Sequence, residues 1–175
     1  MTARPTAVFI GAPGSGKSRI GKKVARLLEV PFIDTDTRIA AEHGPITEIF
    51  ATQGEQQFRL LERRAVAQAL TEEGIVSLGG GAVIDPDTQL DLASQRVVLL
   101  TTTAEAVAAR LANGKRPLLK DGGVEAWSAL VESRRAIYER LATRSWDTST
   151  RPIDAIAEDI AAWLKGTALL KGATE

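Results

Sequence analysis

The stretch Gly11-Ala12-Pro13-Gly14-Ser15-Gly16-Lys17-Ser18 decides the fold of this chain, because it is a complete Walker A loop with fitting flanks. The four residues before it, Ala7–Ile10, form an apolar run that is typical of a buried parallel strand. Helical spacing follows in Ile20, Val24, Leu27 and Leu28. Loop N–H groups and the helix dipole converge on a polyphosphate, so the stretch predicts a nucleoside triphosphate site. Lys17 is expected at the β- and γ-phosphates, and Ser18 is expected to bind Mg²⁺.

The composition indicates an ordinary globular protein without a strongly charged partner. Lys plus Arg and Asp plus Glu number 22 each among 175 residues, so we expect no nucleic acid and no membrane as a partner. The absence of cysteine excludes disulfides and thiolate metal sites. No apolar run approaches the length of a membrane span or of a signal-peptide core. We therefore expect a cytoplasmic monomer with one domain over residues 1–165 and a frayed tail over 166–175.

Short apolar runs alternate with helical patterns along the chain. The strand-like runs are Ala7–Ile10, Pro31–Ile33, Gly74–Leu78 and Arg96–Thr101, with a weaker fifth near Ser145–Thr148. This alternation predicts an α/β fold, with a mostly parallel sheet of about five strands between two layers of helices. Ligands of such sheets bind beyond the carboxyl ends of the strands. The expected site is therefore formed by three segments, Gly11–Ser18, Asp34–Asp36 and Gly79–Gly81.

Two carboxylates follow the second expected strand. Asp34 and Asp36 are two residues apart, so an extended backbone directs both side chains to one side. Beside a Mg²⁺-bound nucleotide, one carboxylate could hold the water shell of the metal, and the other could take a proton from an acceptor hydroxyl. The alternative is that Asp36 or Thr37 caps a helix that begins near Arg38.

Three consecutive glycines, Gly79–Gly81, follow the third expected strand. Without side chains, their backbone amides can approach a ligand closely, although a flexible turn is the alternative. Many P-loop proteins place a magnesium-binding aspartate at the end of this strand, but Ser77 and Leu78 stand here. Asp34 would then have to supply that carboxylate.

The polar, glycine-rich stretch Asn113–Gly123 has no helical periodicity. It predicts either a lid that closes Lys115 and Arg116 over the phosphates or a disordered connector. Taken singly, Arg59 and the pair Arg134-Arg135 are typical of solvated helix faces, and the three tryptophans are typical of packing residues.

Together these segments resemble the shikimate kinases, a branch of the P-loop kinases. The resemblance runs from Ala7 to about Ile153 and depends on the motifs GAPGSGKS (11–18), DTD (34–36), IFATQGEQQFRLLE (49–62), SLGGGAV (77–83), KRPLL (115–119) and SRRAIYERLAT (133–143). It implies a three-layer α/β/α P-loop kinase fold with a mobile lid over about residues 112–124. It also implies ATP-dependent phosphorylation of the 3-hydroxyl of shikimate, with Mg²⁺, in the biosynthesis of chorismate and the aromatic amino acids.

The resemblance assigns roles residue by residue. Lys17, Asp36 and Arg116 would be catalytic, Asp36 as the general base and Arg116 as the lid arginine. Ser18 and Asp34 would hold Mg²⁺, Asp34 through water. The nucleotide would contact Gly14, Ser15, Gly16, Lys17, Ser18, Arg19, Arg110, Arg116 and Arg151, although Arg19 stands where threonine is common. Shikimate would be bound by Asp36, Arg59, Gly81 and Arg135, within a pocket lined by Pro13, Phe50, Phe58, Gly79 and Gly80.

Two other functions remain open from the residues. A gluconate kinase or another small-metabolite kinase would explain the Walker loop and the lid, but not the joint presence of Asp36, Arg59 and Arg135. A module that senses ATP without transferring phosphate would bind ATP without forming product. A GTPase is disfavoured, because the chain has no Asn-Lys-x-Asp motif to bind guanine.

Overall fold

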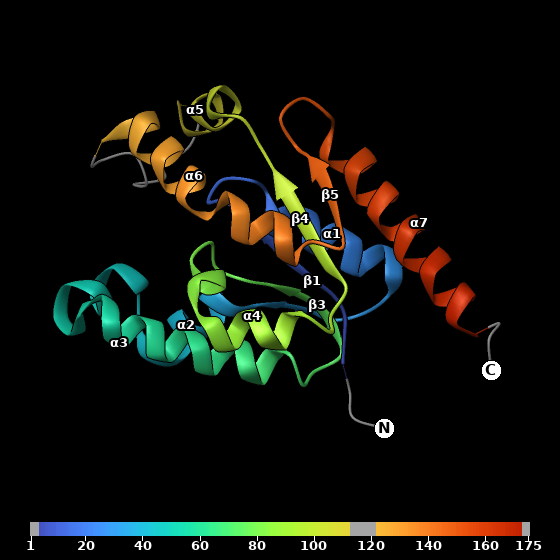
Figure 1. Ribbon diagram of the computed structural model, residues 1–175, viewed down its shortest axis with the longest axis horizontal. Coiled ribbons are helices and arrows are strands. Elements are labelled where there is room, and N and C mark those ends of the chain that lie inside the picture. The colour runs from blue at the N-terminus through green and yellow to red at the C-terminus, as the bar shows by residue number, and fades with distance from the viewer. Residues whose placement is uncertain (1–3, 113–121, 173–175) are drawn as a thin grey trace.

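The computed structural model describes residues 4–112 and 122–172. Five parallel strands form one sheet in the spatial order β2-β3-β1-β4-β5 (Figure 1). The strands are β1 (Pro5–Gly11), β2 (Phe32–Asp34), β3 (Gly74–Ser77), β4 (Val97–Thr101) and β5 (Arg144–Asp147). This arrangement confirms the expected α/β class, including the weakly predicted fifth strand.

Helices cover both faces of the sheet. They are α1 (Lys17–Leu28), α2 (Thr35–His43), α3 (Ile46–Ala69), η1 (Ala82–Ile84, a 3₁₀ turn), α4 (Pro86–Leu92), α5 (Ala104–Ala112), α6 (Gly123–Leu141) and α7 (Ile153–Gly172). Helices α1 and α7 cover one face, and α3, η1, α4 and α6 cover the other. The expected three-layer α/β/α architecture is therefore confirmed. Among the described residues, no helix has the length and apolarity that crossing a bilayer requires.

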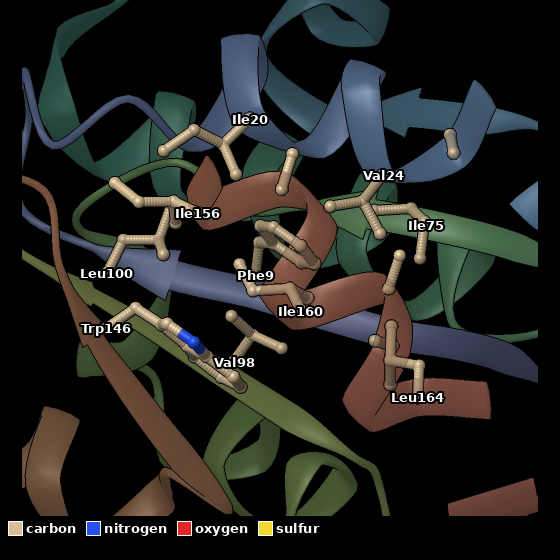
Figure 2. Close-up of a cluster of buried hydrophobic side chains, with 14 residues drawn as sticks. Phe9, Ile20, Val24, Ile75, Val98, Leu100, Trp146, Ile156, Ile160 and Leu164 are labelled. Atoms are coloured by element: carbon tan, nitrogen blue, oxygen red, sulfur yellow. The ribbon is translucent and has the colours of Figure 1, made fainter. Parts of the chain in front are cut away.

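The core on the α1 and α7 face shows why the sheet is so apolar (Figure 2). Phe9 from β1 and Leu100 from β4 lie between Ile20 of α1 and Ile156 and Ile160 of α7, all almost fully buried. Strands covered on both faces need apolar side chains in both directions. The continuous apolar runs that predicted β1 and β4 have this cause.

Several element boundaries differ from the sequence-based expectation. Helix α7 continues to Gly172, whereas a frayed tail was expected from Gly166, and the Ala, Leu and Lys residues of this segment are good helix formers. Residues 82–92 form η1 and α4, which the sequence did not predict. Helix α5 reaches Ala112 and α6 begins at Gly123, at the two ends of the expected lid. The lid residues 113–121 lie outside the described residues.

The register of the strands brings the three expected loops together. Ser77, the last residue of β3, pairs with Phe9 of β1 on one side and with Asp34 of β2 on the other. Because the strands are parallel and end at the same level, the segments that follow β1, β2 and β3 meet at one edge of the sheet.

Candidate active site

Backbone geometry explains the glycines of the loop after β1. Gly11, Gly14 and Gly16 all have positive φ, at 147°, 81° and 91°. A Cβ added to Gly11 would come within 2.3 Å of the Leu100 carbonyl oxygen of β4. The loop therefore requires glycine for both conformation and space at Gly11, and for conformation at the other two positions.

Every carbonyl from Gly11 to Ser15 accepts a hydrogen bond from the protein itself. Lys17 Nζ donates to Gly11 O and Ala12 O at 2.8 and 3.0 Å. Trp127 Nε1 donates to Pro13 O at 2.8 Å, and Thr148 Oγ1 donates to Ser15 O at 2.9 Å. Arg110 Nη1 donates to Gly14 O at 2.8 Å.

Because a trans peptide directs its C=O and N–H in opposite directions, fixing these carbonyls also fixes the loop amides. The first turn of α1 adds N–H groups that have no partner within the helix. Together these donors form an anion site at the start of α1, which is the geometry that the Walker pattern predicts.

Ser18 and Asp34 meet at the edge of this site. Ser18 Oγ donates to Asp34 Oδ2 at 2.5 Å, and the other carboxylate oxygen caps α2 by accepting from Thr37 N at 3.1 Å. The alternative that Asp36 or Thr37 caps a helix beginning near Arg38 is wrong, because α2 begins at Thr35 and Asp34 is its cap. The hydroxyl and the carboxylate are hard oxygen donors that suit Mg²⁺, which takes few protein ligands beside phosphates and water.

Asp36 lies close to Asp34, Lys17 and Arg59. Burial raises the pKa of its carboxyl group, and the nearby Asp34 raises it further, against the opposing effect of Lys17 and Arg59. Its Oδ1 atom is buried without a hydrogen-bond partner. A carboxylate with a raised pKa and a free oxygen atom is suited to accept a proton from a bound hydroxyl.

The glycine triplet lies among all of these groups. A Cβ on Gly79 would come within 2.6 Å of Asp36 Oδ1. One on Gly80 would meet the Pro13 ring at 3.0 Å, and one on Gly81 would meet Arg59 Nη1 at 2.4 Å. The triplet therefore lies between the phosphate-binding loop and the acidic and basic side chains on its other side, and a larger residue would displace Asp36, Pro13 or Arg59.

Four charged side chains cluster beyond the triplet: Asp36 of α2, Arg59 and Glu62 of α3, and Arg134 of α6. We call them the charge cluster. Arg59 Nη1 donates to Glu62 Oε2 at 2.7 Å, and Glu62 is only 4% exposed. Burial raises the pKa of Glu62, while the positive charges of Arg59 and Arg134 lower it. Arg59 Nη2 also donates to Glu55 Oε1 at 3.3 Å. The two glutamates thus hold two of the five N–H groups of Arg59, and the others remain for a ligand.

The two predicted phenylalanines lie on the same helix, at a bend. Gly54, with φ 84° and ψ 167°, interrupts α3 between Phe50 and Phe58. The bend brings the two ring centroids to 4.7 Å, with Phe58 buried and Phe50 38% exposed. Phe58 also places its ring 5.4 Å from the Arg59 guanidinium carbon. The two aromatic rings therefore border the charge cluster.

The structure brings Arg134, rather than the predicted Arg135, to the charge cluster. Arg134 is 8% exposed, and its Nε atom is buried without a partner. Arg135 is exposed and pairs with Glu132 at 2.8 Å. It lines an open groove of about 720 Å³ together with Trp127 and residues 101–104. A helix turns by about 100° per residue, so a shift of one position moves a side chain to a different face.

The other arginines predicted to contact the nucleotide do not all lie against the phosphate-binding loop. Arg110 lies against the phosphate-binding loop and also donates to Thr102 Oγ1 at 3.3 Å and to Thr148 O. Arg151 is exposed and pairs with Asp159 of α7 at 2.5 Å. Arg19 is exposed on the first turn of α1. Arg116 lies outside the described residues.

Sequence reasoning missed four side chains that hold the site: Glu62, Trp127, Arg134 and Tyr138. Tyr138 OH donates to Gly80 O at 2.6 Å. Periodicity could have found three of them, since Trp127, Arg134 and Tyr138 are spaced by seven and four residues and share the buried face of α6. Glu62 follows Arg59 by three residues, which is the spacing of a helical ion pair.

Known proteins resemble this chain over nearly its whole length. The model of the shikimate kinase family matches residues 13–165. A shikimate kinase from Mycobacterium avium is 45% identical over 174 residues, which cover 97% of this chain and 99% of that protein. A solved structure of shikimate kinase from Acinetobacter baumannii in complex with shikimate has a TM-score of 0.84 at 26% identity, with 95% of each chain covered. A gluconokinase from Sinorhizobium meliloti, with a TM-score of 0.58 at 18% identity over 100% of this chain and 99% of that one, shares the fold alone.

Proposed function

Because this chain belongs to the shikimate kinase family, we propose that it transfers the γ-phosphoryl group of ATP to the 3-hydroxyl of shikimate. The products are shikimate 3-phosphate and ADP, and the reaction serves the biosynthesis of chorismate and the aromatic amino acids. The observation that carries the proposal is the position of the glycine triplet. The triplet lies between an anion-binding loop and a cluster that supplies arginines for a carboxylate and an aspartate for a hydroxyl.

In this reaction the oxygen of the 3-hydroxyl forms a bond to the γ-phosphorus. The bond from the γ-phosphorus to the bridging oxygen breaks, and ADP leaves with the electron pair. The hydroxyl proton goes to the carboxylate of Asp36, whose raised pKa favours its acceptance. Positioning and charge stabilisation then supply most of the rate enhancement.

On the nucleotide side, the loop amides bind the phosphates and Lys17 exchanges its contacts with Gly11 O and Ala12 O for phosphate oxygens. Ser18 and Asp34 would hold Mg²⁺, Asp34 through water. Bound there, the metal ion neutralises charge on the phosphates. Arg110 and Arg151 flank the adenine in this proposal, Arg19 follows the metal-binding serine, and Arg116 contacts the transferring phosphate.

On the shikimate side, Arg59 and Arg134 bind the carboxylate. We assign this role to Arg134 in place of Arg135, because Arg134 lies in the charge cluster with an unpartnered Nε atom. Planar guanidinium groups match the two oxygens of a carboxylate. Gly81 and Asp36 complete the contacts with the substrate, and Pro13, Phe50, Phe58, Gly79 and Gly80 line the pocket.

The test is ADP release by the purified protein with Mg·ATP, alone and with shikimate, gluconate or quinate. We expect release that depends on shikimate, with shikimate 3-phosphate identified by mass spectrometry. Release with gluconate or quinate instead would show that the kinase acts on another acceptor. ATP binding without release for any acceptor would indicate an ATP sensor and would contradict the proposal.

A further inference from the structure

The peptide between Gly80 and Gly81 is held by a side chain from a distant helix. The Tyr138 hydroxyl of α6 donates to Gly80 O at 2.6 Å, and Tyr138 is 4% exposed. No other hydrogen bond reaches this carbonyl from residues 4–112 or 122–172. The phenol hydroxyl is thus the constraint on the orientation of this peptide.

The neighbouring peptides are fixed in other ways. Gly79 N donates to Thr35 Oγ1 at 3.3 Å, and Gly79 O accepts from Ala82 N at 3.1 Å. Gly81 O accepts from Ile84 N at 3.1 Å. Glycine gives the backbone wide freedom, so a peptide between two glycines can rotate unless a contact prevents it. Of these peptides, only the one between Gly80 and Gly81 depends on Tyr138.

Fixing the Gly80 carbonyl also fixes the Gly81 amide. The described chain contains no cis peptide, so the Gly81 N–H points away from Tyr138. This N–H has no acceptor within the described part of the chain. Gly81 lies directly against Arg59, since an added Cβ would come within 2.4 and 2.8 Å of Nη1 and Nη2. An amide donor and a guanidinium donor therefore lie side by side, as a carboxylate requires.

We propose that Tyr138 is a positioning residue, which fixes the Gly80–Gly81 peptide so that the Gly81 N–H can donate to the carboxylate of shikimate beside Arg59. The proposal rests on the proposed function. Tyr138 does not touch the substrate. The Tyr138 side chain also interacts with Arg134, so it contacts both the Gly80–Gly81 peptide and an arginine assigned to the carboxylate. Its effect should therefore depend on whether the bound substrate carries a negative carboxylate.

The experiment compares Tyr138→Phe with the unaltered protein on two substrates, shikimate and its neutral methyl ester. Phenylalanine keeps the ring and removes only the hydroxyl. We expect kcat/KM for shikimate to fall by about 5- to 20-fold through KM, the loss typical of one oriented hydrogen bond to a charged group. We expect kcat/KM for the methyl ester and KM for ATP to change by less than about twofold, because neither depends on the carboxylate charge.

Thr88→Val is the matched control. Thr88 is 1% exposed, and its hydroxyl is buried in α4 without a partner. This variant also removes a buried hydroxyl, but it should leave the ratio between shikimate and the ester unchanged. A general loosening of the fold would also leave this ratio unchanged. Thermal melts of both variants would measure such loosening.

Four outcomes would overturn the proposed role: unchanged kinetics in Tyr138→Phe, an equal loss for both substrates, a loss confined to ATP, or a Gly81 amide resonance in shikimate-bound Tyr138→Phe that matches the unaltered protein. The last outcome would show that the hydroxyl acts through Arg134 and not through the peptide. Should Tyr138→Phe fail to fold, the ¹⁵N-labelled glycine amides of the unaltered protein can be followed as shikimate or the ester is added. A Gly81 amide shift with the ester as large as with shikimate would then contradict the proposal. Absence of shikimate phosphorylation by the unaltered protein would instead contradict the proposed function.

Discussion

The phosphate-binding loop and the charge cluster lie on either side of the glycine triplet, yet they are built in opposite ways. In the loop, each carbonyl from Gly11 to Ser15 is already hydrogen-bonded by the protein. In the charge cluster, Asp36 Oδ1 and Arg134 Nε are buried without partners. Apart from Ser15 Oγ, which is also buried without a partner, the loop is a complete backbone site, whereas the cluster holds charged atoms whose hydrogen bonds a ligand must complete.

This contrast explains how one small site can recognise two ligands. A polyphosphate needs many amide donors in a fixed shell, and a short contiguous segment can supply them. A carboxylate with neighbouring hydroxyls needs charged side chains from several directions, and these come here from α2, α3 and α6. Burial of such groups without partners lowers stability, which is common at functional sites.

The largest expected losses of kcat come from one residue of the phosphate-binding loop and one of the charge cluster. Lys17→Ala should lower kcat by roughly 10³-fold or more, because it removes the positive charge beside the transferring phosphate.

Asp36→Asn affects the other side of the site and should lower kcat by orders of magnitude through loss of the proton acceptor. Both are measured as ADP release, with circular dichroism to confirm the fold. Near-normal turnover in either folded variant would refute the mechanism.

The next effect tests which arginine of α6 belongs to the charge cluster. Arg134→Ala should raise KM for shikimate by about 10- to 100-fold, since a charge-assisted hydrogen bond is lost. Arg135→Ala removes only an exposed pair with Glu132 and should stay within about twofold.

Arg134→Lys is the folding control, because it keeps a positive charge near Glu62 but loses the planar geometry. A loss in Arg135→Ala equal to or larger than that in Arg134→Ala would restore the original assignment from the sequence.

The smallest effect concerns stability. The folded-state pKa of Asp36 is raised above its ordinary value of 3.8, chiefly by burial, so the folded protein favours the protonated form. The contribution of Asp36 to the free energy of unfolding is then fully present below pH 3.8 and is lost as the pH rises through the raised pKa. Asp36→Asn removes this loss. We expect it to melt about 2–4 °C higher at pH 7, which corresponds to a gain of about 1 kcal/mol.

Melting curves between pH 7 and pH 3.5 would check the sign, because the gain should shrink as the pH falls. Glu73→Gln, which removes an exposed carboxylate after α3, should show no such trend. A variant Asp36→Asn that melts below the unaltered protein at pH 7 would show that the attraction of Lys17 and Arg59 outweighs burial.

Contiguous features could be predicted well from the sequence. The Walker loop, the two carboxylates and the triplet each follow a strand directly, so the rule for parallel sheets was enough to bring them together. Strands β1, β3 and β4 were found because their runs are apolar on both faces, whereas β5 buries only Trp146 and was predicted weakly. The boundaries were harder: α2 begins at Thr35 because Asp34 is its cap, and α7 runs to Gly172.

The sequence by itself determined the fold class, the family and the phosphate-binding loop, because these depend on local spacing and on residue types with few alternatives. The tertiary structure alone decided which arginine of α6 enters the charge cluster, that Glu62 holds Arg59, and that Tyr138 holds the Gly80 carbonyl. Each of these depends on the rotation of a helix and on what packs against it. Adjacent residues such as Arg134 and Arg135 are chemically identical in the sequence, and only packing places one inside and one outside.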